Sequence, residues 1–223
     1  MPKWRSSPLK LRSSGRWVVL ALAIALSLGW AQAAAAAPRV ALIIGISAYE
    51  KVTPLANPAK DAKLVQTTLQ KLGFQVTMLN NPTRIQLLES LGAFEESVKG
   101  SEAAVVYFAG HGAMIDGVNY LLPKDAVTSS KVALTGTAVE SARLGQSLTG
   151  AKAVRLVILD ACRNNPTATR SLGGNTRGLV RETSSASVQV VTLMAAGPGE
   201  VAQDGTGANS PFATALTQWL SRP

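Results

Sequence analysis

The chain contains a single histidine, His111, and a single cysteine, Cys162. Each comes at the end of an apolar run: EAAVVYFAG precedes His111, and VRLVILD ends two positions before Cys162. A nearby imidazole turns a thiol into a good nucleophile by raising its thiolate fraction or accepting its proton, and can later protonate a leaving amine. If the fold brings these residues together, the pair predicts nucleophilic attack on a carbonyl carbon.

Attack on a carbonyl also creates a negatively charged oxygen, which needs hydrogen-bond donors. The backbone N–H groups of Gly112 and Cys162 are the candidates, because both residues follow expected strand ends. Each residue also has a structural alternative, since a lone buried cysteine usually fills a core and a histidine beside glycines can occupy a turn. The joint occurrence of His111 and Cys162 at two strand ends favours catalysis over that alternative.

Strands and helices must alternate along the chain to position this pair. Apolar runs predict strands at 39–47, 75–79, 102–110, 154–160 and 187–196, and Asp116–Gly117 predicts the turn of a small separate hairpin within 113–123. Helical periodicity predicts helices over 58–72, after the capping box of Thr83 and Gln86, over 137–149, and after Ser210 with Pro211 at the first position. The residues expected to face inward are Ala62, Val65, Leu69 and Leu72 in the first helix, Ile85, Leu88, Leu91, Phe94 and Val98 in the second, and Phe212, Ala215, Leu216 and Trp219 in the last.

This alternation predicts an α/β domain built around a mostly parallel sheet. In such sheets the active site gathers at the carboxyl ends of the strands. A right-handed crossover can place the ends of two strands side by side, which is the arrangement that His111 and Cys162 require.

The first 37 residues have the three parts of a signal peptide. A basic segment leads into the apolar run WVVLALAIALSLGW and then into AQAAAAAP, where Ala31–Ala33 offers an Ala-x-Ala cleavage site. The alternative is an uncleaved N-terminal anchor. Either way we expect export to the periplasm or the exterior, a leader at 1–37, a folded domain at 38–223, and no membrane contact for the mature protein unless the anchor is kept.

The strongly basic composition does not indicate a nucleic-acid partner. Five of the 22 Lys and Arg residues fall in the first 16 positions, which leaves 17 against 13 acidic residues in the rest of the chain. No stripe of basic residues interleaved with aromatics is present. We therefore expect no nucleic-acid binding.

The motifs FAGHG, ending at Gly112, and LDACRNN, at 159–165, resemble those of the caspase–metacaspase superfamily of cysteine peptidases, especially its bacterial members. The resemblance extends over 39–223, through ALIIGISAY, VNYLLPKDA and NSPFATAL. It implies a three-layer sandwich, with a mostly parallel sheet flanked by helices. It also implies a His111–Cys162 dyad, an oxyanion hole from Gly112 and Cys162, and protein or peptide substrates.

The same resemblance suggests which bond is cut. Metacaspases, which cleave after arginine or lysine, have an aspartate two positions before the cysteine, and here that residue is Asp160. Asp61 matches a second aspartate of the metacaspase pocket, although a carboxylate at a helix N-terminus is also an ordinary dipole-stabilising group. Two carboxylates would pair with a cationic P1 side chain and repel an acidic one. The chain departs from the pattern at Ala109, where a serine is usual, and at Arg163, whose charge favours the thiolate but opposes a basic substrate.

Several alternatives stay open at this point. A catalytically silent interaction module and a peptide ligase or transferase would share the same motifs, since hydrolysis and transfer share one acyl-enzyme. Acidic residues such as Asp116 and Asp125 are scattered, so we expect no metal and no cofactor. The Gly/Ser-rich loop at 163–187 carries Arg170, Arg177 and Arg181, which are hypothetical sites of self-cleavage.

Overall fold

The apolar runs of the sequence form a sheet that lies between two layers of helices, and its central strands are buried. The computed structural model describes residues 37–162, 189–195 and 207–222. The leader up to residue 36, Arg163 and the loop with the three candidate self-cleavage arginines lie outside the described residues, so those predictions are not addressed by it. None of the helices in the described ranges combines the length and the apolar character that crossing a bilayer requires.

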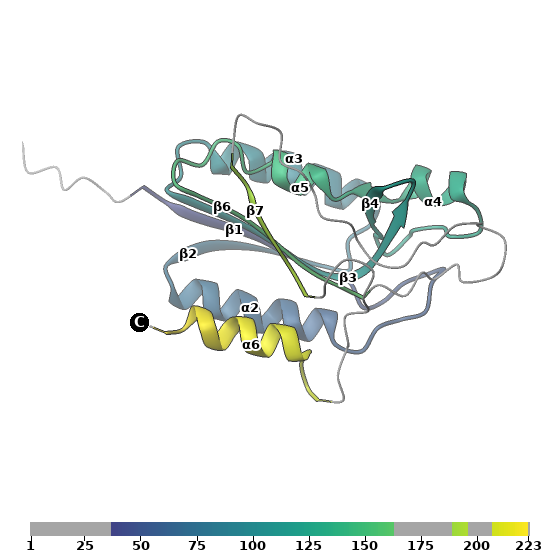
Figure 1. Ribbon diagram of the computed structural model, residues 1–223, viewed down its shortest axis with the longest axis horizontal. Coiled ribbons are helices and arrows are strands. Elements are labelled where there is room, and N and C mark those ends of the chain that lie inside the picture. Colours follow the sequence, from purple (N-terminus) through teal and green to yellow (C-terminus); the bar gives the residue numbers. More distant parts are fainter. Residues whose placement is uncertain (1–36, 163–188, 196–206, 223) are drawn as a thin grey trace, which may run out of the picture. The chain divides into compact units, whose positions relative to one another are not determined.

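Five strands run parallel in one sheet with the order β2-β1-β3-β6-β7 (Figure 1). Their bounds are β1 Arg39–Gly45, β2 Phe74–Asn80, β3 Ala103–Ile115, β6 Val154–Cys162 and β7 Val191–Met194. Two short strands, β4 Val118–Leu121 and β5 Val139–Glu140, pair antiparallel and extend the sheet from the far end of β3. The prediction of a mostly parallel sheet is confirmed.

Helices cover both faces of this sheet, which gives the three expected layers. Figure 1 shows α2 Pro58–Lys71 and α6 Pro211–Leu220 side by side on one face, and α3 Arg84–Val98 with α5 Ala142–Gln146 on the other. A further short helix, α4 Lys131–Thr137, follows the β4 segment. Strand β1 illustrates the consequence: six of its seven residues are buried, because alternate side chains pack into the two opposite cores.

The inward faces of the helices confirm the predicted pattern in part. In α2 the residues Ala62, Val65 and Leu69 are buried as expected. The capping box at Thr83 is present, but Ile85 is 66% exposed, and the buried stripe of α3 is instead Leu87, Leu91, Phe94 and Val98. Their spacing of four, three and four residues keeps them on one face, whereas Ile85 lies on the other.

The last helix shows a similar shift of its inner face. Ser210 caps α6 and Pro211 begins it, as predicted. However, Ala213, Leu216 and Thr217 are buried, while Ala215 is exposed and Trp219 is 67% exposed with its ring 4.1 Å from the Arg222 guanidinium. The prediction for Ala215 and Trp219 was wrong because the apolar residues of α6 are compatible with two faces, and only packing against α2 selects one.

The region predicted as one helix at 137–149 is shorter and more irregular. Residues 139–140 are drawn into the sheet by pairing with β4, so the helix begins only at Ala142. The unpredicted helix α4 begins at Lys131 and is capped by Ser130, whose hydroxyl accepts a hydrogen bond from the N–H of Ala133.

Strand β3 is longer than the sequence predicts. The expected strand and the first arm of the hairpin form one continuous strand from Ala103 to Ile115, followed by a turn in which Asp116 and Gly117 both have positive φ. His111 therefore lies within β3 rather than beyond its end. It occupies the position where β3 stops pairing with β6 and begins pairing with β4.

Candidate active site

His111 and Cys162 are direct neighbours across the sheet. The parallel pairing of β3 with β6 begins at Ala103 and Val154, and its last pair is His111 with Cys162. Adjacent strands in a sheet lie about 4.8 Å apart, so the two backbones are as close as neighbouring strands allow. The fold thus brings together the two positions that the sequence singles out for chemistry.

The imidazole of His111 is held by a backbone carbonyl. Its Nε2 lies 2.8 Å from the carbonyl oxygen of Thr53, in the loop between β1 and α2. A carbonyl can only accept a hydrogen bond, so Nε2 carries the hydrogen and Nδ1 is the basic nitrogen of the neutral ring. Sequence reasoning missed Thr53, because any residue supplies a backbone carbonyl and its side chain leaves no signal.

Tyr49 positions the backbone and the ring of His111. The His111 N–H donates to the Tyr49 hydroxyl oxygen at 2.7 Å, and the two ring centroids lie 4.7 Å apart at an angle of 52°. Gly110 is required for this approach, because a Cβ at that position would lie 2.6 Å from the Tyr49 hydroxyl oxygen. Tyr49 lies in the segment ALIIGISAY, but nothing in the sequence connects it to His111.

The alternation of side chains between the two faces of β3 reverses around His111. Tyr107 and Ala109 pack into the core beneath α2, whereas Ala113 and Ile115 pack into the opposite core with Tyr49. In a regular strand these four odd-numbered residues would share one face. The reversal falls within Gly110–Gly112 and is what lets the imidazole meet the ring of Tyr49.

Gly112, the predicted oxyanion-hole residue, is buried directly after His111. It is paired with Leu121 of β4 and lies beside the end of β6. Its N–H and that of Cys162 thus belong to consecutive register positions at the end of the parallel sheet. Their role in stabilising an oxyanion stays a prediction.

Asp61 and Asp160 come from different elements but share one partner, Ser210. The Ser210 N–H donates to Asp61 Oδ1 at 2.9 Å, and the Ser210 hydroxyl donates to Asp160 Oδ2 at 2.9 Å. Asn209 adds a bond from its side-chain amide to Asp61 Oδ1 at 2.8 Å. Both carboxylates are buried, and they converge on the N-terminus of α6.

A buried tyrosine completes this cluster. The Tyr107 hydroxyl donates to Asp160 Oδ2 at 2.9 Å. Burial raises the pKa of Tyr107 well above its usual value, and the negative charges of Asp160 and Asp61 raise it further. Both carboxylates therefore act on the same hydroxyl, which indicates that they form one acidic centre.

The other acidic residues considered for a metal have structural partners. Asp116 pairs with Lys131 beside the β3–β4 turn, and Asp125 Oδ1 accepts the N–H of Arg84 at 2.8 Å. In the part of the chain that the structure describes, no group of three or more His, Cys, Asp or Glu residues could hold a metal ion.

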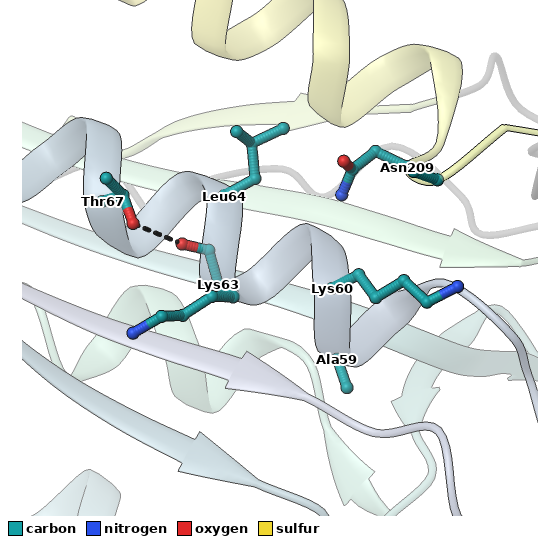
Figure 2. Close-up of a pocket in the computed structure, with 7 residues that line it drawn as sticks. Ala59, Lys60, Lys63, Leu64, Thr67 and Asn209 are labelled. Atoms are coloured by element: carbon teal, nitrogen blue, oxygen red, sulfur yellow. Dashed lines mark hydrogen bonds between the residues drawn. The ribbon is translucent and has the colours of Figure 1, made fainter.

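One open cavity lies outside this centre. It has a volume of about 610 Å³ and is lined by Ala59, Lys60, Lys63, Leu64, Thr67, Ala208 and Asn209 (Figure 2). It runs along the outer side of α2, and none of the five predicted site residues lines it. Asn209 connects it to the acidic centre through its bond to Asp61.

Comparison with known proteins matches most of this chain to one family. The family model described as the caspase domain matches residues 38–223. Comparison with curated proteins gave no match. Among solved structures, the crystal structure of protein GSU0716 from Geobacter sulfurreducens is 19% identical, covers 57% of this chain and 52% of that one, and has a TM-score of 0.45. The match thus spans about half of that protein, and the assignment rests on the family model. With its sheet flanked by helices and its His111–Cys162 register pair, the chain belongs to the caspase domain family of the caspase-like cysteine peptidase superfamily.

Proposed function

We propose that this protein is a cysteine endopeptidase that uses His111 and Cys162 as a catalytic dyad and cleaves after arginine or lysine. The observation that carries the proposal is the register pairing of the only histidine with the only cysteine of the chain, at the last step of the β3–β6 ladder. A scaffold protein would have no need to keep this pair.

The contacts of His111 support a division of labour within its ring. Nδ1 accepts the proton of the Cys162 thiol as the sulfur attacks the peptide carbonyl, and then passes this proton to the leaving amine. The carbonyl of Thr53 keeps the hydrogen on Nε2 and stabilises the positive imidazolium that forms between the two steps. The N–H groups of Gly112 and Cys162 donate to the developing oxyanion, and water then hydrolyses the thioester.

The acidic centre supports a cationic substrate side chain. Its hydrogen bonds come from a hydroxyl of Tyr107, a hydroxyl and an N–H of Ser210, and an amide of Asn209. These donors stabilise the negative charge of the two carboxylates. An arginine can bind a carboxylate through two parallel hydrogen bonds, whereas an aspartate would be repelled.

A peptidase assay tests both parts of the proposal. Fluorogenic peptides that differ only in Arg, Lys or Asp at P1 are compared on the wild type, Cys162→Ala and Asp160→Asn, with Asp116→Asn as the control for a lost surface charge. We expect Arg and Lys peptides to be cleaved, Cys162→Ala to lose at least a thousandfold in kcat/KM, and only Asp160→Asn to lose the preference for a basic P1. Equal cleavage rates for the wild type and Cys162→Ala would refute the proposal that the protein is a cysteine peptidase. A preference for Asp at P1 would refute the proposal that Asp160 forms a pocket for basic side chains.

A further inference from the structure

We propose that Ser210 is a positioning residue for P1 specificity, because it holds Asp61 and Asp160 in one cation-binding arrangement. The inference rests on the proposed function and deepens it, since it names what keeps the two carboxylates together. Nothing in the spacing of the sequence links Ser210 to these residues, which lie 149 and 50 positions away.

Ser210 contacts the two carboxylates with different groups. Its backbone N–H reaches Asp61 on α2, and its hydroxyl reaches Asp160 on β6. The same hydroxyl oxygen accepts the N–H of Ala213 at 3.0 Å and so caps α6. Ser210 is 2% exposed, so these bonds are sheltered from competing water.

The Ser210 hydroxyl also donates a hydrogen bond, which capping a helix does not require. An N-cap only has to accept a hydrogen bond, and glycine at this position costs only a few tenths of a kcal/mol relative to serine. The Ser210 hydroxyl instead donates its hydrogen to Asp160 Oδ2, which also accepts a hydrogen bond from the Tyr107 hydroxyl. Two hydroxyl donors on one oxygen orient the carboxylate, and a buried carboxylate that loses one of its donors is costlier to keep charged.

This arrangement offers matched variants that separate specificity from folding. Ser210→Gly removes the hydroxyl but nearly preserves the capping energy, and Ser210→Thr keeps both. Tyr107→Phe removes a different donor to Asp160 and leaves the Ser210 cap of α6 in place. A role confined to bracing α6 predicts no change in cation binding for Tyr107→Phe.

The test measures cation binding apart from catalysis. The dissociation constant of the fluorescent cation p-aminobenzamidine, with neutral p-aminobenzamide as its control, is measured for the wild type and the three variants. The ratio of kcat/KM for P1 arginine over P1 citrulline is measured in parallel. We expect Ser210→Gly and Tyr107→Phe each to weaken amidine binding and lower the ratio by about tenfold, mainly through KM, and Ser210→Thr to restore both. Alkylation of Cys162 by iodoacetamide, which reports on the dyad, is expected to stay unchanged.

The outcomes separate this inference from the proposed function. If the wild type binds the amidine in a Ser210-dependent way but cleaves nothing, the peptidase proposal fails and the positioning role stands. If the wild type cleaves after arginine while Ser210→Gly and Tyr107→Phe keep the binding constant and the ratio, the positioning role is overturned. Absence of amidine binding by the wild type also overturns it. Should Ser210→Gly fail to fold, the result for Tyr107→Phe decides.

Discussion

The contact between Tyr49 and His111 gives the sharpest test of how the histidine is held. The Tyr49 hydroxyl oxygen accepts the His111 N–H at 2.7 Å, and both residues are buried. In Tyr49→Phe this N–H has lost its acceptor, and a buried donor without a partner costs about 1–3 kcal/mol. For a domain of this size, a loss of about 2 kcal/mol lowers Tm by about 4–8 °C.

The same change is expected to affect catalysis beyond stability. The hydroxyl that Tyr49 loses is the one that holds the His111 backbone, and a misplacement of about 1 Å can cost about a hundredfold in rate. We expect kcat for an arginine peptide to fall by about tenfold or more, with a smaller change in KM, because the pocket of Asp160 is not touched. The pH profile of the Cys162 alkylation rate is expected to shift as well, since this profile reports on the pairing of thiol and imidazole.

Tyr120→Phe is the matched control for this experiment. It removes the hydroxyl of a half-buried tyrosine on β4 and leaves the Tyr49 contact in place. We expect it to change the free energy of unfolding by less than about 0.5 kcal/mol. If Tyr49→Phe matched Tyr120→Phe in Tm, in kcat and in its alkylation profile, the reasoning about His111 would be refuted.

Three further predictions follow from particular residues. Gly110→Ala is expected to destabilise the protein and abolish activity, because the new Cβ would lie 2.6 Å from the Tyr49 hydroxyl oxygen. Thermal unfolding and peptide cleavage measure both effects, and a variant with wild-type Tm and cleavage rate would contradict this prediction. The raised pKa of Tyr107 means that above pH 10 the unfolded chain releases a proton that the native state retains, so stability falls as pH rises. Between pH 10 and 11 the wild type should lose about 1 kcal/mol more than Tyr107→Phe in urea unfolding, and parallel losses would exclude the effect. Export in a bacterial host is expected to remove the leader after Ala33, which the intact mass of the purified protein measures. A mass that includes the leader would favour the uncleaved anchor instead.

The sequence predicted the parallel sheet because its central strands are covered on both faces. A run such as that of β1 has nearly every residue buried, so it reads as continuously apolar whatever its neighbours are. The caps at Thr83 and Ser210 were also predictable, since a cap is formed by residues a few positions apart.

The faces of the helices were harder to predict. Ile85 and Trp219 are apolar and fit a helical period, yet both are exposed. A helix with apolar residues on more than one side has no unique inner face until it packs, so the sequence pattern allows both choices.

The candidate site also contains residues that the sequence predicted and contacts that it could not predict. His111 and Cys162 could be picked from the sequence because each is the only residue of its type and comes at the end of an apolar run, and Asp160 because the resemblance to metacaspases implies it. The contacts of Thr53, Tyr49, Tyr107 and Ser210 could not, because they join segments up to 62 positions from His111 and 50 or more from Asp160.

The sequence by itself determined which residues are candidates for the chemistry and which segments become strands, because both depend on local residue types and short-range periodicity. Only the tertiary structure decided how that chemistry is held. It set the register that pairs His111 with Cys162, aimed the carbonyl of Thr53 at the imidazole, and joined two distant carboxylates through Ser210. The physical reason is that a backbone carbonyl or a serine hydroxyl is common in any chain, and its partner is selected only when the packed layers bring it within hydrogen-bonding distance.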